Sequence, residues 1–253
     1  MTFFQPPPQT RYDLVFNLGK IPVQVHPLFW LMALLFGLNS PDILVLLVWI
    51  LVIFIAILIH ELGHALVMWM YGQPSYILLY HFGGLTIPIP SRWGGTTISE
   101  SFTSNQEILV SLAGPFAGFF SAVVISIVVF ATGGAVWINW VFGFIPMPVV
   151  ILPGGYSLVY SFVSTFLWVS IFWGIINLLP VYPLDGGNVA RHLFLKADPW
   201  DGVRNSLWLS VIFGALASIV GLFLLNSMYM ALLFAILAGQ SYLTVQGRSR
   251  TLF

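Results

Sequence analysis

The pentapeptide His60-Glu61-Leu62-Gly63-His64 places two histidines four residues apart, with a glutamate directly after the first. On a helix, residues four apart project from nearly one face, so His60 and His64 can hold one metal ion. Glu61 lies about 100° around the helix from His60 and can reach a water beside that ion. This pattern is typical of hydrolytic zinc sites. A pair of hydrogen-bonded core histidines is the structural alternative.

The segment that must position this motif is apolar. The pentapeptide lies inside the long apolar run from Ile43 to Met70, which is long enough to cross a bilayer as a helix. Three ionisable side chains in such a helix are costly unless they have a function. The motif and its surroundings together predict metal-dependent hydrolysis of peptide bonds inside a membrane.

The composition is that of an integral membrane protein. The chain is 59% hydrophobic and 6% charged, whereas soluble domains carry about 25% charged residues. A formal net charge of zero gives no indication of a nucleic-acid partner, and we expect none. The absence of cysteine excludes disulfides and thiolate metal sites.

We predict an all-α polytopic membrane protein with about six transmembrane helices and a short membrane-associated β-hairpin. The predicted spans are 27–38, 43–71, 107–132, 156–182, 206–226 and 228–245. The first is short unless Ile21–Val25 extends it. We divide the chain into a cytoplasmic or interfacial segment at 1–26, a single transmembrane domain at 27–246 and a cytoplasmic tail at 247–253.

Two apolar stretches do not fit the helical pattern. Residues 76–89 are short, with Gly83-Gly84 in their middle, and predict two strands around a two-residue turn. An interfacial loop is the alternative. Residues 135–152 are interrupted by glycine and proline, and they are either a seventh span or a segment that does not cross the membrane.

The distribution of positive charge decides between six and seven spans. With six spans and a cytoplasmic N-terminus, all eight Lys and Arg residues fall on the cytoplasmic side. A seventh span at 135–152 would move Arg191, Lys196 and Arg204 outside. We therefore interpret 135–152 as an interfacial or re-entrant segment on the outer face, and we expect both termini in the cytoplasm.

A catalytic zinc needs a third protein ligand and one open position. Asp185 is the candidate, because it follows Pro180 and Pro183 at the end of the fourth predicted span and precedes two glycines. Broken backbone at membrane depth occurs only where it lines a protein interior or a wet cavity. The second and fourth spans run in the same direction, so His60, His64 and Asp185 can converge. A helix-cap or turn aspartate is the alternative. The other histidines are expected to be interfacial or structural: His26, His81 and His192.

The chain resembles the site-2 proteases, a family of intramembrane zinc metallopeptidases. The resemblance covers residues 20 to 245 approximately and rests on four features: HELGH at 60–64, SLAGP at 111–115, Asn177 and PLDGG at 183–187. It implies that His60, His64 and Asp185 bind one Zn²⁺ and that Glu61 activates water. It also implies that Asn177 holds substrate or stabilises the oxyanion. The polar stretches 91–107 and 188–205 are too short to hold a PDZ or CBS domain.

The same resemblance implies a membrane-spanning protein substrate and regulated intramembrane proteolysis. The compact six-span form without appended domains favours a prokaryotic plasma membrane as the location. A transmembrane helix hides its carbonyls in internal hydrogen bonds, so we expect the substrate to unwind and add as a strand to the edge of 76–89. The alternative function is a membrane zinc transporter or channel using the same ligands. A catalytically inactive membrane scaffold is a third possibility. The sequence identifies neither the substrate, nor the gating, nor the oligomeric state.

Overall fold

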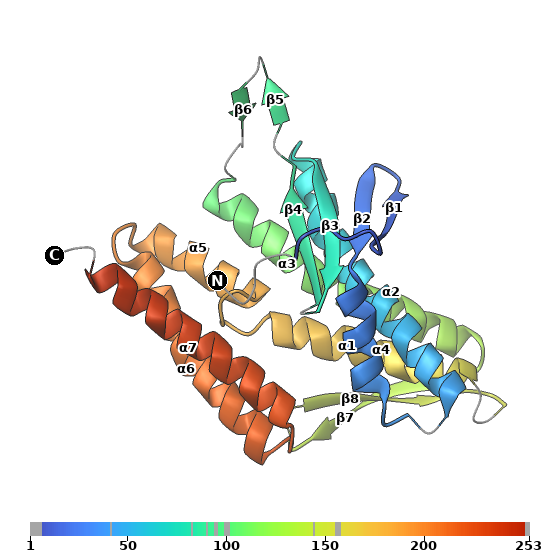
Figure 1. Ribbon diagram of the computed structural model, residues 1–253. Helices are drawn as coiled ribbons and strands as arrows, with labels where there is room; N and C mark the ends of the chain where they lie inside the picture. The colour runs from blue at the N-terminus through green and yellow to red at the C-terminus, as the bar shows by residue number, and fades with distance from the viewer. Residues whose placement is uncertain are drawn as a thin grey trace. The chain divides into compact units, whose positions relative to one another are not determined.

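The computed structural model (Figure 1) describes residues 7–40, 42–81, 83–89, 91–93, 96–98, 102–143, 145–154 and 158–250. The chain forms two compact units. The first unit comprises Met1–Glu100 and Ala113–Gly174, and the second comprises Ser101–Leu112 and Ile175–Phe253.

Helix α2 (Ile43–Met70) carries the HELGH motif and belongs to the first unit. The helix begins after Asp42, whose side chain accepts a 2.9 Å hydrogen bond from the backbone N–H of Val45. This is the usual arrangement of an N-cap, which satisfies one of the free N–H groups of the first turn. The helix ends before Gly72, which adopts a positive φ of 78° that glycine tolerates without strain.

Five helices in the described part of the chain are long and apolar enough to cross a membrane, where the sequence predicted six. Besides α2 they are α3 (Ser104–Ala131), α4 (Leu158–Asn177), α6 (Gly202–Phe223) and α7 (Met228–Arg250). The five helices make this an integral membrane protein.

The expected first span is instead the 11-residue helix α1 (Pro27–Gly37), which is too short to be counted with them. Its start is fixed by His26, whose Nδ1 accepts a 3.2 Å hydrogen bond from Leu28 N, and by Pro27 at the first helical position. Residues Ile21–Val25 therefore do not extend the helix, and they form a strand.

The structure is mostly helical, as predicted, but the first unit contains a four-stranded sheet where the sequence predicted a single hairpin. Its strands are β1 (Leu14–Leu18), β2 (Ile21–Val25), β3 (Ser75–Tyr80) and β4 (Gly83–Pro88), in the order β1-β2-β3-β4. The central pair β2 and β3 is parallel, and the chain between them forms α1 and α2 (Figure 1). Alternate side chains of β2 and β3, including Val23, Ile77 and Leu79, are buried in one cluster with Ile57 and Ala65 of α2. The sheet is thereby fixed against the half of α2 that carries the HELGH motif.

Strands β3 and β4 lie where the sequence predicted a hairpin, and they pair antiparallel. The predicted position of the turn was wrong. Gly83 and Gly84 belong to β4, where they pair with Tyr80 and Leu79, so the connection precedes them. A further short pair consists of β5 (Ser91–Trp93) and β6 (Thr96–Ile98). Association of β3 and β4 with the membrane stays a prediction.

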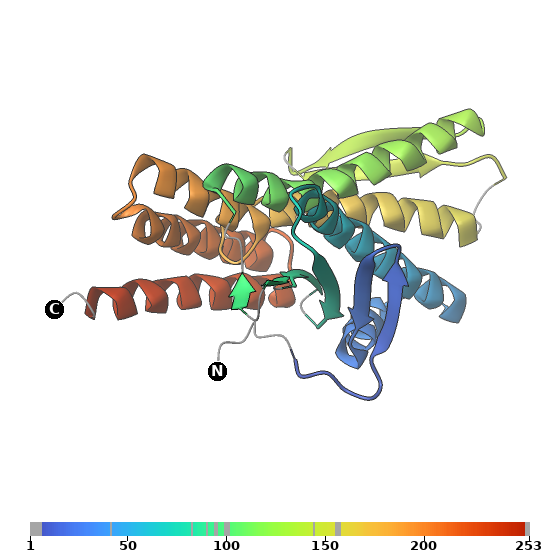
Figure 2. The same cartoon turned by 90° about the horizontal axis from the view of Figure 1, so that it is seen from above.

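Residues 135–152 form a second hairpin and not a helix. Strand β7 (Ala135–Val141) pairs antiparallel with β8 (Ile145–Ile151). Val136 and Val150 share a cluster with Ala122 and Val129 of α3 and Leu167 of α4. Figure 2 shows the hairpin alongside α3. The stretch is therefore not a helical span, as the charge distribution indicated, whereas its placement on the outer face stays a prediction.

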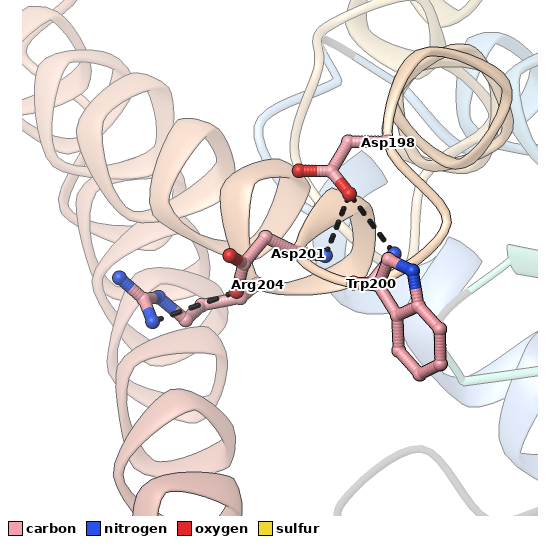
Figure 3. A network of polar contacts seen from close by, with 4 residues as sticks. All are labelled: Asp198, Trp200, Asp201 and Arg204. Carbon is pink, nitrogen blue, oxygen red and sulfur yellow. Dashed lines mark hydrogen bonds and ion pairs between the residues drawn. The ribbon is translucent and has the colours of Figure 1, made fainter.

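In the second unit the fourth predicted span ends earlier than expected. Helix α4 stops at Asn177, and a new helix, α5 (Asp185–Ala197), starts eight residues later. Much of the polar stretch 188–205 is thus helical. A turn links α5 to α6: the N–H groups of Trp200 and Asp201 donate to Asp198 Oδ1 at 3.0 and 3.2 Å (Figure 3). Arg204 of α6 forms an exposed ion pair with Asp201 at 3.5 Å.

Helices α6 and α7 pack closely because small residues line their contact. A Cβ atom at Gly214 would lie 3.0 Å from the Cβ of Ala238. Ser218 Oγ donates a 2.8 Å hydrogen bond to the carbonyl of Ala231 across the same contact. Close backbone approach at small residues is the usual mode of helix association in membranes, where apolar surface alone gives no preference for protein over lipid.

Candidate metal centre

The two histidines of the HELGH motif converge as the sequence predicted. Their Nε2 atoms lie 3.2 Å apart, and their rings are inclined at 78° with centroids 4.9 Å apart. Both side chains are buried, with exposed fractions of 3% for His60 and 7% for His64. The pair therefore directs two ring nitrogens toward one point inside the first unit.

Gly114 of α3 closes one side of this histidine pair. A Cβ atom added to Gly114 would lie 2.2 Å from His64 Nε2 and 2.8 Å from His60 Nε2. In the other direction, a Cβ atom on Gly63 of α2 would lie 2.4 Å from the carbonyl oxygen of Ala113. The two helices meet at their glycines, and the segment SLAGP thereby acquires a structural role beside the histidines.

Glu61 faces strand β4. Thr86 Oγ1 lies 2.8 Å from Glu61 Oε2 and 3.1 Å from the Glu61 carbonyl oxygen. The carboxylate is buried, with 4% of the residue exposed. A Cβ atom on Gly84 would lie 2.3 Å from Glu61 Cγ, so the strand can approach the side chain only because position 84 is a glycine.

Tyr80 lies at the end of β3, and its pKa is affected by the Glu61 carboxylate. Burial raises the pKa of the Tyr80 phenol, and the negative charge of Glu61 raises it further. Both effects disfavour a phenolate, so Tyr80 is a neutral phenol at physiological pH. The hydroxyl of Thr86 contacts the Glu61 carboxylate directly, whereas Tyr80 interacts with it through its charge.

Asp185 lies in the second unit, as the first residue of α5 and not at the end of the fourth span. The N-cap is Leu184, so Asp185 does not cap its helix. The preceding chain is held by α6, since Ser210 Oγ accepts a 3.0 Å hydrogen bond from Tyr182 N. The two positions that follow Asp185 have no room for a side chain, so both are glycines. A Cβ atom on Gly186 would lie 2.1 Å from the Leu178 carbonyl oxygen.

Asn177 is buried at the end of α4, immediately before the irregular segment that leads to Asp185. No sequence motif points to Thr86, Tyr80 or Ser210, because their interactions with Glu61 and Tyr182 join positions that are distant in sequence. Gly84 and Gly114 were noted as parts of glycine motifs, but no pattern in the sequence relates them to Glu61 or His64.

Comparison with known proteins places the chain in a family. The family model described as peptidase family M50 matches residues 48–219. A zinc metalloprotease of Methanocaldococcus jannaschii is 26% identical over 184 residues, which are 72% of this chain and 45% of that protein. Stage IV sporulation protein FB of Bacillus subtilis is 29% identical over 181 residues, which are 71% of this chain and 50% of that protein. The chain thus spans about half the length of these relatives.

The fold is similar to that of a solved structure, a site-2 protease from Methanocaldococcus jannaschii. The TM-score is 0.55 at 21% sequence identity, and the match covers 92% of this chain and 95% of that one. The family model covers more than half of the chain and includes the histidine pair, Glu61, Gly114 and Asp185. The protein therefore belongs to peptidase family M50.

Proposed function

We propose that this protein is an intramembrane zinc metalloprotease that hydrolyses peptide bonds in or near transmembrane segments of its substrates. The observation that carries the proposal is the 3.2 Å approach of His60 Nε2 to His64 Nε2 on a helix long enough to span a membrane. Glu61 lies between these histidines in sequence, and its side chain is buried against strand β4. Membership of a peptidase family supports hydrolysis as the chemistry.

The proposed metal ligands are His60, His64 and Asp185. Two imidazoles and a carboxylate form a donor set typical of catalytic zinc, which leaves one position open. In a tetrahedral site with Zn–N bonds of about 2.05 Å, two ligand nitrogens lie about 3.3 Å apart, and the observed separation is 3.2 Å. Both imidazoles are buried and Asp185 is partly buried. The chemistry of this donor set suits a single Zn²⁺ ion.

Zinc held by these residues would act as a Lewis acid and lower the pKa of a water molecule toward neutrality. Glu61 acts as the general base that takes a proton from the water, and it later delivers this proton to the leaving amine nitrogen. Asn177 is proposed to donate a side-chain N–H to the oxyanion of the tetrahedral intermediate, or to hold the substrate backbone. Burial of the three motif residues limits competing bulk water.

The proposed substrate is a membrane-spanning protein, cut while it is held in the bilayer. Its helix must unwind before the carbonyl is attacked, and strand β4 lies at the edge of the sheet, where an extended segment can add. Helix-breaking residues near the cut are therefore expected to favour cleavage. We propose a prokaryotic plasma membrane as the location, with both termini in the cytoplasm. That orientation requires a sixth crossing besides the five long helices, and with six crossings every Lys and Arg lies inside.

A zinc transporter or channel would use the same ligands but would not need a glutamate directly after His60. Membership of peptidase family M50 argues against it. The catalytically inactive scaffold is disfavoured by the intact HELGH motif.

The test uses the purified full chain in proteoliposomes with a single-span reporter protein whose transmembrane segment contains a Gly-Pro pair. Glu61→Gln is expected to retain one zinc per chain by mass spectrometry and to lose cleavage. His60→Ala is expected to lose both zinc and cleavage. Cleavage by Glu61→Gln at the wild-type rate would contradict the proposal. Zinc flux across the vesicle membrane without any proteolysis would favour the transporter.

A further inference from the structure

We propose that Thr86 of β4 is a positioning residue for Glu61, and that its hydroxyl fixes the carboxylate in the orientation required of the general base. This inference rests on the proposed function of Glu61. Thr86 lies in the sheet, 25 residues away from the HELGH motif in sequence. No part of the proposed mechanism so far assigns it a role.

The contact has the geometry of a hydrogen bond from a neutral hydroxyl to a carboxylate. Thr86 Oγ1 is 2.8 Å from Glu61 Oε2 and 3.1 Å from the Glu61 carbonyl oxygen. A threonine hydroxyl has one hydrogen, so it donates to one acceptor at a time. The carboxylate is the nearer and the stronger acceptor, because hydrogen bonds to charged groups are shorter and stronger than neutral ones.

The surroundings show why a separate residue is needed for this purpose. Glutamate has three rotatable bonds, and fixing them costs conformational entropy that a catalytic base should lose before the reaction begins. Thr86 is β-branched and belongs to a paired strand, so its own side chain is restricted. Gly84, two residues before Thr86, leaves the space in which the Glu61 side chain lies along β4. The strand thus holds the carboxylate on one side, while its remaining lone pairs stay able to accept a proton.

Two other roles for Thr86 make different predictions. A residue that contacts substrate at the strand edge would change KM when altered. A residue that merely supports the packing of β4 would change stability and zinc content. A positioning residue changes kcat with KM and zinc content preserved, and a serine in its place restores the function because serine keeps the hydroxyl.

The test compares Thr86→Val, which keeps the shape and removes the hydroxyl, with Thr86→Ser, which keeps the hydroxyl. Thr244→Val is the matched control, because Thr244 Oγ1 donates only to the Gln240 carbonyl in α7, at 2.8 Å. The readouts are kcat and KM for the single-span reporter, zinc content, and the carboxyl ¹³C signals of labelled glutamate in lipid. The chain has only three glutamates, Glu61, Glu100 and Glu107, and loss of a signal in Glu61→Gln identifies that of Glu61.

Thr86→Val is expected to lower kcat about tenfold to a hundredfold with KM and zinc content unchanged. It should also shift the Glu61 carboxyl signal, and Thr86→Ser should restore both. An unshifted Glu61 signal in Thr86→Val overturns the inference, as does a change confined to KM or a loss of zinc. The carboxyl signal needs no turnover. If the wild-type chain cleaved no reporter, the proposed function would fail while the contact of Thr86 with Glu61 remained measurable.

Discussion

Gly114 of α3 stands directly against His64 of α2, since a Cβ atom on Gly114 would lie 2.2 Å from His64 Nε2. Two helices from separate parts of the chain therefore meet at the atom that is proposed to bind the metal. Glycine at this position leaves the space that the His64 imidazole occupies. We therefore expect metal binding to depend on Gly114, although Gly114 itself offers no ligand atom.

Gly114→Ala is expected to reduce zinc content well below one ion per chain, because the methyl group would displace both imidazoles. Gly118→Ala, one helical turn further along α3, is the control. Its Cβ would meet the nearest atom, the Ser170 carbonyl oxygen, at 3.3 Å. Zinc content by mass spectrometry, with helicity by circular dichroism, separates loss of metal from loss of fold. Wild-type zinc content in a folded Gly114→Ala protein would show that the imidazoles move aside without consequence.

Asp185→Ala is expected to weaken zinc binding by more than about a hundredfold, because changes in residues that only orient ligands already cost about 10- to 100-fold. Competition with a chromogenic chelator measures the affinity. Asp198→Ala is a matched control, because that carboxylate accepts hydrogen bonds from Trp200 and Asp201 in the α5–α6 turn. Equal zinc affinity in the Asp185 variant and the wild type would exclude Asp185 as the third ligand.

Ser210→Ala tests how α6 holds the segment before Asp185. The change removes the acceptor for Tyr182 N, which is bound at 3.0 Å. A fully buried donor left unsatisfied costs about 1–3 kcal/mol, and because this donor is only partly buried we expect a loss near the lower end, about 1 kcal/mol. We expect a lower unfolding temperature and a zinc affinity weakened by up to about tenfold, since 1.4 kcal/mol is a factor of ten in binding. Ser218→Ala also removes a hydroxyl from α6, but that hydroxyl bonds to Ala231. It should lower stability while leaving zinc affinity unchanged. Equal zinc affinity in the two serine variants would mean that the segment keeps its position without Ser210.

The histidine pair could be predicted from sequence because its geometry is local. Residues four apart on one helix must project together, and the apolar run around them could only be a long helix in a membrane. The boundaries of the other elements were less certain. Ile21–Val25 and residues 135–152 are apolar without a clear period, and such segments form strands or helices according to the partners they meet. Here they meet other strands, so the fold has five long helices with sheets in place of six spans and one hairpin.

The tertiary structure alone decided what surrounds the motif. Nothing in the order of residues indicates that Thr86 donates to Glu61, that Gly84 admits its side chain, or that Gly114 makes room for His64. These contacts join α2 to β4 and to α3. Side-chain periodicity reports which residues share a face of one element, whereas contacts between elements depend on how the faces pack. The sequence by itself therefore determined the histidine pair and its setting in a long apolar helix, and packing decided how Glu61 is held and how much space remains beside the histidines.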